Sequence, residues 1–245
     1  MPAFFIHGFH AVAGRLRQAP QSINEIYLDA ERQDPRANEL RRQAASYDIK
    51  VIDTARARLD GMAPPARHQG VVAKVRGDAD KAPSLDDLLE SLKEEALLVV
   101  LDGVTDPHNL GAVLRVADAA GAHGVIVPKD RAVGLNATVR KVASGAAESV
   151  PLVSVTNLAR SLDEMKEYGL AVVGASEDAP KTLYDIDIER RVAWVFGSEG
   201  AGMRRLTRER CDRLARLPMH GSVQSLNVSV AAAVCLFETR RRHTK

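Results

Sequence analysis

Cysteines, clustered metal ligands and long apolar runs are scarce or missing in this chain of 245 residues. Its two cysteines, Cys211 and Cys235, have no metal-ligand spacing and form no disulfide framework, so we expect a reducing, cytoplasmic environment and no metal cofactor. No apolar run reaches the roughly 18 residues that a membrane-spanning helix needs. The start of the chain has no basic segment before its short apolar stretch, so we also expect no signal peptide.

The rest of the composition is that of a soluble globular protein, with 45% hydrophobic and 27% charged residues. The net charge of +2 is unevenly divided along the chain. Residues 1–76 hold 12 Lys and Arg against 8 Asp and Glu, whereas the remainder holds 22 against 24. The first part is therefore the better candidate for contact with a polyanion, although a few arginines on a solvated face would give the same count.

Residues 1–76 have the pattern of a small α/β domain. The predicted strands are residues 25–28, 48–52 and 71–75, and the predicted helices are residues 8–19 and 38–47. The histidines His7, His10 and His68 have no cysteine or close acidic residue to complete a metal site. We interpret them as polar surface residues.

A polar, turn-rich stretch at residues 77–83 is the predicted linker, and Ser84 with Asp87 forms a capping-box pattern that predicts a short helix after it. From residue 96 onward, apolar strands alternate with helices. The predicted strands are residues 97–101, 124–127, 150–153, 170–174, 192–196 and 214–217. This alternation is typical of a doubly wound α/β domain, a mostly parallel sheet covered by helices on both faces.

A glycine-rich loop, Gly197-Ser198-Glu199-Gly200-Ala201-Gly202-Met203, follows the predicted strand at residues 192–196. Its glycines allow positive φ and close approach of a ligand to the backbone. The G-x-x-G-x-G spacing matches neither the dinucleotide fingerprint nor the phosphate-binding loop. Glu199 would repel a phosphate, which favours a neutral or cationic ligand. An ordinary turn with a solvated Glu199 is the competing interpretation.

Residues 102–115 also follow a predicted strand, at the position where parallel α/β sheets bind ligands. Arg115 lies beside the apolar stripe of the following helix, and Gly111 one turn earlier leaves room over its side chain. A surface pair between Arg115 and Asp118 is an equally good interpretation.

Residues 217–230 join the last predicted strand to a long apolar helix. Ser225 is the predicted N-cap of this helix, and Asn227 in the first turn has the character of a second capping residue. The residues predicted to face a core are Leu226, Val230, Val234 and Phe237. Near the end of the helix, residues 240–242 are three arginines that suit the helix C-terminus and a phosphate backbone equally well.

Together these stretches resemble the SpoU family of RNA ribose 2′-O-methyltransferases, also called the TrmH family, in the SPOUT superfamily. The resemblance rests on Asn109-Leu110-Gly111-Ala112-Val113-Leu114-Arg115, on residues 195–200, and on residues 217–219 with 225–231. It extends to residues 7–12 and 68–70, which are similar to the ribosomal-protein-like, RNA-binding extension of one subgroup. Three separate motifs in this order are highly specific.

The resemblance implies an architecture and a reaction. It implies a ribosomal-protein-like α/β substrate-binding domain at residues 1–76, a linker and short helix at 77–95, and a SPOUT α/β catalytic domain with a C-terminal deep trefoil knot at 96–245. The implied cofactor is S-adenosyl-L-methionine, and the implied substrate is a guanosine ribose of 23S ribosomal RNA, free or in a large-subunit precursor. The implied state is a homodimer.

The resemblance also assigns roles by position. Gly197, Leu217, Met219 and Leu226 are expected to bind the cofactor, and the active-site polar set is Asn109, Arg115, Glu199, Ser225 and Asn227. The family uses the residue at the position of Arg115 to activate the ribose hydroxyl. Because a guanidinium with a pKa above about 12 is a poor base, we hypothesise that Arg115 stabilises the developing alkoxide electrostatically. Glu199 and Asn227 are expected to orient substrate and loops.

Three alternatives remain open from the sequence. A transfer-RNA ribose methylase of the same family is the nearest, and the N-terminal extension favours ribosomal RNA over it. A non-catalytic RNA-binding assembly factor would not need an intact polar set. A dinucleotide-dependent oxidoreductase fits the α/β pattern, but the chain has no G-x-G-x-x-G motif.

Overall fold

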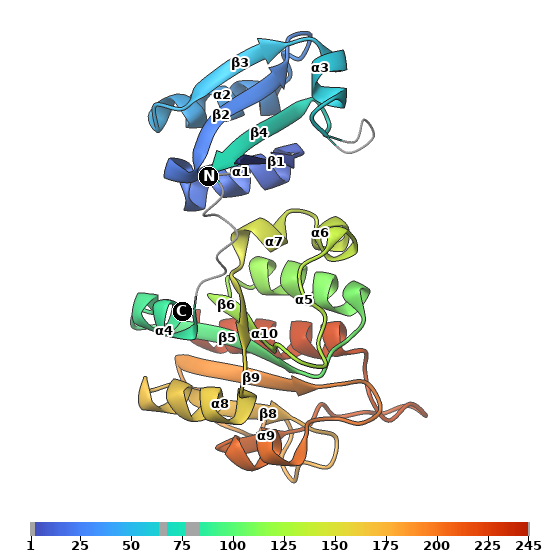
Figure 1. Cartoon of the computed structure of the whole chain (residues 1–245). Helices are drawn as coiled ribbons and strands as arrows, with labels where there is room; N and C mark the ends of the chain where they lie inside the picture. The colour runs from blue at the N-terminus through green and yellow to red at the C-terminus, as the bar shows by residue number, and fades with distance from the viewer. Residues whose placement is uncertain (1–2, 64–67, 77–83, 245) are drawn as a thin grey trace. The chain divides into compact units, whose positions relative to one another are not determined.

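The structure is a computed structural model that describes residues 3–63, 68–76 and 84–244 (Figure 1). The chain divides into two compact units, Met1–Lys81 and Ala82–Lys245. The predicted linker at residues 77–83 lies outside the described residues. Among the helices of the described ranges, none is long and apolar enough to cross a membrane.

The first unit is built on a mixed sheet with strand order β1-β4-β2-β3. Its elements are β1 (Ala3–His7), α1 (Phe9–Gln18), a 3₁₀ turn (Pro20–Ser22), β2 (Ile23–Asp29), α2 (Pro35–Ser46), β3 (Lys50–Thr54), α3 (Arg56–Asp60) and β4 (Val71–Arg76). Leu16 of α1 and Leu40 of α2 pack on one face of the sheet, and Leu59 of α3 packs on the other. The predicted strands and helices are all present, whereas β1 and α3 were not predicted.

His68 is buried in this unit, so its interpretation as a surface residue is wrong. Its Nδ1 atom accepts a hydrogen bond from the backbone N–H of Gly70 at 2.9 Å, and its Nε2 atom lies 2.8 Å from the carboxylate of Asp60. Both ring nitrogens are therefore used within the fold. The imidazole is a structural group that fixes the approach to β4.

The second unit contains a parallel sheet with strand order β10-β8-β9-β5-β6-β7. Its elements are α4 (Leu85–Ser91), β5 (Ala96–Asp102), α5 (Pro107–Ala119), β6 (Gly124–Pro128), α6 (Ala137–Ala143), α7 (Ala146–Ser149), β7 (Leu152–Val155), α8 (Leu158–Glu167), β8 (Ala171–Ala175), β9 (Arg191–Gly197), α9 (Arg205–Arg210), β10 (Arg213–Ala215) and α10 (Val228–His243). The predicted doubly wound sheet is confirmed.

Alternate side chains of β5 enter two different cores. Leu97 and Leu101 pack with α5 and α10, whereas Leu98 and Val100 pack with α4 and α8. Figure 1 shows α5 and α10 on one side of the sheet and α8 on the other. A strand buried on both faces needs an unbroken apolar run, and all of β5 is buried. The capping box predicted at Ser84 and Asp87 starts α4.

The end of α10 is fastened by its arginines to backbone carbonyls. Arg240 donates to the carbonyl oxygens of Ala120 and Gly121, and Arg242 donates to those of Leu183 and Ile186. Arg240 and Arg242 thus bind carbonyls of other segments, and neither of the two uses expected from the sequence, the C-terminus of their own helix or a phosphate backbone, accounts for these bonds. As a result, α10 lies along α5 and its N-terminus reaches the carboxyl edge of the sheet.

Candidate active site

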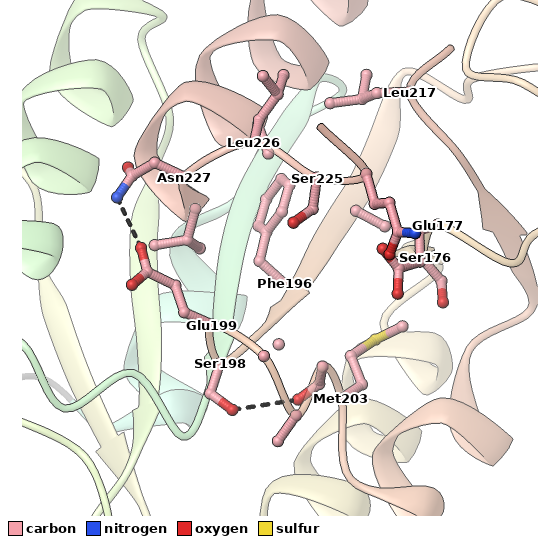
Figure 2. A pocket seen from close by; sticks show the side chains of 18 of the residues that line it. Ser176, Glu177, Phe196, Ser198, Glu199, Met203, Leu217, Ser225, Leu226 and Asn227 are labelled. Atoms are coloured by element: carbon pink, nitrogen blue, oxygen red, sulfur yellow. Dashed lines mark hydrogen bonds between the residues drawn. The ribbon is translucent and has the colours of Figure 1, made fainter. Parts of the chain in front are cut away.

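A cavity of about 610 Å³ opens at the carboxyl ends of β8 and β9 (Figure 2). This volume lies in the range of small-molecule sites, and parallel α/β sheets bind ligands at this edge. All the residues predicted to bind a cofactor line the cavity, namely Gly197, Leu217, Met219 and Leu226. Of the predicted catalytic residues, Glu199, Ser225 and Asn227 line it, whereas Asn109 and Arg115 do not.

The cavity has an apolar side and a polar side. Figure 2 shows Phe196 in the middle of the wall, with Leu217 and Leu226 above it and Met203 below. Glu199 and Asn227 face each other on one side, and Ser176 and Glu177 lie on the other. Such a site can hold a flat apolar ring against its apolar wall while carboxylates approach a positively charged group.

The glycine loop folds back on itself at the floor of the cavity. A side-chain carbon on Gly197 would lie 2.0 Å from the carbonyl carbon of Gly202 and 2.2 Å from the nitrogen of Met203, so no side chain fits there. Two backbone hydrogen bonds between Ser198 and Gly202, of 3.1 and 3.0 Å, close the loop. The close approach expected at the backbone of Gly197 is therefore made by Gly202 and Met203 of the same chain.

Three polar side chains from distant parts of the sequence meet beside the cavity. Asn109 donates to Glu199 at 3.1 Å, and Asn227 donates to Glu199 at 2.7 Å and to Asn109 at 2.8 Å. We call Asn109, Glu199 and Asn227 the polar corner. It joins the first turn of α5, the glycine loop and the start of α10. Because one side-chain oxygen of Glu199 accepts from both amides, the corner needs an acceptor oxygen at this position.

The N-cap of α10 is Asn227 and not Ser225, so the prediction for Ser225 as a cap is wrong. The side-chain oxygen of Asn227 accepts from the backbone N–H of Ser229 at 2.9 Å and from its hydroxyl at 2.6 Å. Ser225 instead lies exposed in the cavity wall, ahead of the helix. Asn227 therefore both caps α10 and holds Glu199.

The prediction of which face of α10 is buried is also wrong. Leu226, Val230 and Phe237 are 36, 47 and 50% exposed, and only the partly buried Val234 packs against the core. The residues of α10 that are buried are Val228, Ala232, Cys235, Leu236, Glu238 and Thr239. Residues 228–237 of the helix are apolar on nearly every side, and the outer apolar face is uncovered in a single chain.

Arg115 stands outside the polar corner. Its side chain is exposed on α5, and within the described residues it makes no hydrogen bond or ion pair, so the alternative pair with Asp118 is not formed. Gly111 does not make room over Arg115. A side chain at Gly111 would lie 2.7 Å from Cβ of Val142, because α6 packs closely there. Arg115 is thus free to meet something other than its own chain.

Sequence reasoning missed the loop that follows β8. Arg208 donates to the Ser176 hydroxyl at 2.7 Å and to both carboxylate oxygens of Asp178 at 2.9 and 3.0 Å. The hydroxyl of Ser176 and then the guanidinium of Arg208 lower the pKa of Asp178 below its ordinary value. All three residues line the cavity. The signal was available, because the strand at 170–174 was predicted and its carboxyl end is a ligand-binding position.

Neither cysteine takes part in the site. Burial raises the pKa of the Cys211 thiol to about 12, and it raises that of Cys235 as well. Cys235 is 1% exposed in the core under α10, which confirms its interpretation as a small core residue. Within the described residues, no group of three or more histidines, cysteines and acidic residues could hold a metal ion.

Two family models match this chain. The model of the SpoU rRNA Methylase family matches residues 96–237, and the model of RNA 2′-O ribose methyltransferase substrate binding matches residues 5–79. The chain belongs to the SpoU rRNA methylase family. The resemblance stated from its motifs is confirmed.

Relatives in the SpoU family match over nearly the full length. The 23S rRNA (guanosine-2′-O-)-methyltransferase RlmB of Nitrosomonas europaea is 58% identical over 241 residues, which are 98% of this chain and 92% of that protein. The protein of the same name from Bordetella pertussis is 56% identical over 235 residues, 96% of each chain. A solved structure, the SpoU methyltransferase AviRb of Streptomyces viridochromogenes in complex with the cofactor AdoMet, has a TM-score of 0.75 and 28% identity, and the match covers 98% of this chain and 90% of that one.

Proposed function

We propose that this SpoU family member methylates the ribose 2′-hydroxyl of a guanosine in 23S ribosomal RNA with S-adenosyl-L-methionine. The observation that carries the proposal is the full-length similarity to 23S rRNA guanosine-2′-O-methyltransferases, combined with a cavity bordered by the polar corner. We assign residues 1–76 to RNA binding, 77–95 to the connection and 96–245 to catalysis. The proposed action on ribosomal RNA supports our assignment of the protein to the cytoplasm.

The cavity fits S-adenosyl-L-methionine on chemical grounds. Leu217, Met219 and Leu226 offer an apolar wall for the adenine ring, and the backbone of the glycine loop offers polar groups. Glu177 and Glu199 are exposed carboxylates on the wall that favour a cationic ligand. When bound, the cofactor supplies a methyl group on a positively charged sulfur. Ser225 lies on the same wall and is available to orient either the cofactor or the target ribose.

The polar corner and Arg115 have different roles in the reaction. Glu199 and Asn227 hold the glycine loop and α10 in one arrangement, which places the cavity wall relative to Asn109. Arg115 stabilises the negative charge that develops on the ribose oxygen as its proton leaves, because a guanidinium keeps its charge at neutral pH. Pre-placed charge of this kind is more effective than charge that must be reoriented during the reaction.

The RNA lies along the edge of the sheet next to Arg115. The loop after β6 is tied to the loop after β5 by a hydrogen bond of 3.1 Å from Val133 N–H to the carbonyl of Val104. This loop and α6 carry Lys129, Arg131 and Lys141, all exposed and, within the described chain, without an ion pair. Unpaired cations of this kind bind phosphates with little cost from breaking internal contacts.

We further propose that the enzyme is a homodimer with a C-terminal trefoil knot. The exposed apolar face of α10, with Val230 and Phe237, lies on the same helix pair as Arg115 and is suited to a second copy. A dimer through α10 would bring Arg115 near the partner's surface, where it finds the contacts it lacks in one chain.

Methyl transfer from labelled S-adenosyl-L-methionine to purified RNA tests the function. We expect label in 23S ribosomal RNA, at one guanosine ribose, and little in transfer RNA. Label mainly in transfer RNA would support the transfer-RNA methylase instead. Binding to 23S RNA without transfer would support an assembly factor.

A further inference from the structure

Asp102, at the end of β5, is a buried carboxylate that the proposed reaction does not use. Its side chain is 0% exposed, and its charge is matched by Arg204, which is 47% exposed. The backbone N–H of Arg204 donates to one carboxylate oxygen at 2.8 Å, and Nε of Arg204 donates to the other at 2.5 Å. A carboxylate buried to this degree is strongly unfavourable unless it is fully paired, so this arrangement is specific.

Asp102 binds Arg204, the residue at which the glycine loop ends. The loop begins at Gly197, which pairs with Asp102 in the register of β5 and β9, and it ends at Arg204, the N-cap position of α9. Asp102 thus touches both ends: its backbone is paired with the entry and its side chain binds the exit. The side chain of Arg204 makes no capping hydrogen bond to α9 and binds Asp102 instead.

The loop between these ends forms part of the cavity wall. Gly202 and Met203 directly precede Arg204, and both line the cavity. They also lie against Gly197, where a shift of a few tenths of an ångström would produce a clash or a gap. Holding the amide of Arg204 therefore fixes where Gly202 and Met203 stand in the wall.

We propose that Asp102 is a positioning residue for the cofactor cavity, which it shapes by locking Arg204 and hence the closed form of the glycine loop. The cofactor part of this inference rests on the proposed function. The locking part concerns the loop alone. Loss of the lock should mainly weaken cofactor binding, because Gly202 and Met203 of the cavity wall directly precede Arg204. Glu199 lies in the same loop but is held independently by Asn109 and Asn227, so the chemical step should be affected less.

The test compares D102N and R204A with D212N in the full-length protein. In D102N one carbonyl oxygen still accepts from the Arg204 amide, but the new amide group presents N–H toward the guanidinium. D212N is the matched control, because Asp212 also accepts a backbone N–H, from Val172 at 2.7 Å, at the opposite end of β8 from the cavity. Calorimetry gives the dissociation constant of S-adenosyl-L-methionine, and steady-state kinetics give KM and kcat.

We expect D102N to weaken cofactor binding about 10-fold and to raise KM for the cofactor similarly, with kcat within about 3-fold of wild type. R204A keeps the backbone N–H but leaves the buried carboxylate without its cation, so it should weaken binding about 10-fold as well. D212N should bind as wild type does. Hydrogen exchange across residues 198–204 should be faster in D102N than in wild type or D212N.

Each outcome decides a separate point. Wild-type affinity and unchanged exchange in folded D102N would overturn the proposal. If D102N does not fold, R204A takes its place, and wild-type binding and exchange in R204A would overturn it. If wild type itself does not bind S-adenosyl-L-methionine, the proposed function fails, and exchange in residues 198–204 still tests the lock.

Discussion

Asn109 and Arg115 lie on the same helix and have opposite surroundings. Asn109 is 9% exposed and tied to Glu199 and Asn227, whereas Arg115 is exposed and, within the described residues, has no bonded partner. One part of the site is organised by the chain itself. The other part becomes organised only when RNA or a second copy arrives. We therefore expect changes at the polar corner to affect the free protein and changes at Arg115 to affect only the reaction.

The largest effect should come from R115A. Removing the guanidinium should lower kcat by about 100- to 1,000-fold, in the range seen when a charge-stabilising group is lost from an active site. The melting temperature and the cofactor dissociation constant should change little, because the exposed Arg115 side chain makes no hydrogen bond or ion pair with the described residues of its own chain. R115K separates charge from geometry: near-normal turnover with lysine would support charge alone, and loss equal to R115A would require the guanidinium itself.

A smaller effect is expected at Glu199, and it depends on which residue replaces it. E199A removes the acceptor that joins Asn109 and Asn227, so we expect kcat/KM to fall about 100-fold and the protein to be less stable by about 1–2 kcal/mol. E199Q keeps a carbonyl oxygen in the same place and should stay within about 10-fold of wild type in kcat/KM. A near-complete loss of turnover in E199Q with normal stability would instead make Glu199 a proton acceptor.

The outer face of α10 provides the next test. F237E places a charge at a side chain that is 50% exposed in the single chain, so the fold should be kept. If this face binds a second copy, burying the charge would be unfavourable, and the dimer should dissociate at concentrations where wild type remains dimeric. Sedimentation measures this directly. A dimeric F237E with full activity would exclude this face as the interface.

The smallest effect on activity should come from Glu238, far along α10 from the polar corner. Arg241, and then Arg242, lower the pKa of Glu238 to about 2 from its ordinary 4.5, against the opposing effect of burial. Because the folded-state pKa is depressed, the ion pairs stabilise the protein above about pH 4.5, and this stability is lost as pH falls toward about 2. E238Q should cost about 1–3 kcal/mol at pH 7, less than the full shift suggests because Arg241 is largely exposed.

Denaturant titrations at several pH values check this prediction. The stability difference between wild type and E238Q should be constant near neutral pH and shrink below about pH 4.5. A difference that does not change with pH would mean that packing, and not charge, accounts for the loss. Methyl transfer at neutral pH should be the same in both proteins.

The sequence predicted the sheet well because buried parallel strands are unbroken apolar runs. It failed at β1, where the apolar stretch is short and the pairing partner β4 lies about 70 residues away. The sequence also failed to predict which face of α10 is buried, because residues 228–237 are apolar on nearly every side. Periodicity could therefore not separate the buried Val228 and Ala232 from the exposed Val230 and Phe237.

The motifs pointed to candidate site residues, but not to their arrangement. The polar corner joins positions 109, 199 and 227, and no local pattern states that Glu199 accepts from both asparagines. Ser225 was chosen as the N-cap because serine is a good cap, yet Asn227 competes with equal chemistry and begins the helix. Asp102 was not singled out, because its burial and its bond to Arg204 depend on a contact across 102 positions.

Ribose methylation of 23S ribosomal RNA in cells that lack this protein tests the central claim most directly. The cells should lose methylation at one guanosine ribose, the wild-type gene should restore it, and R115A should not restore it although the variant is folded and binds the cofactor. Methylation that is unchanged in the absence of the protein, or fully restored by R115A, would contradict the account.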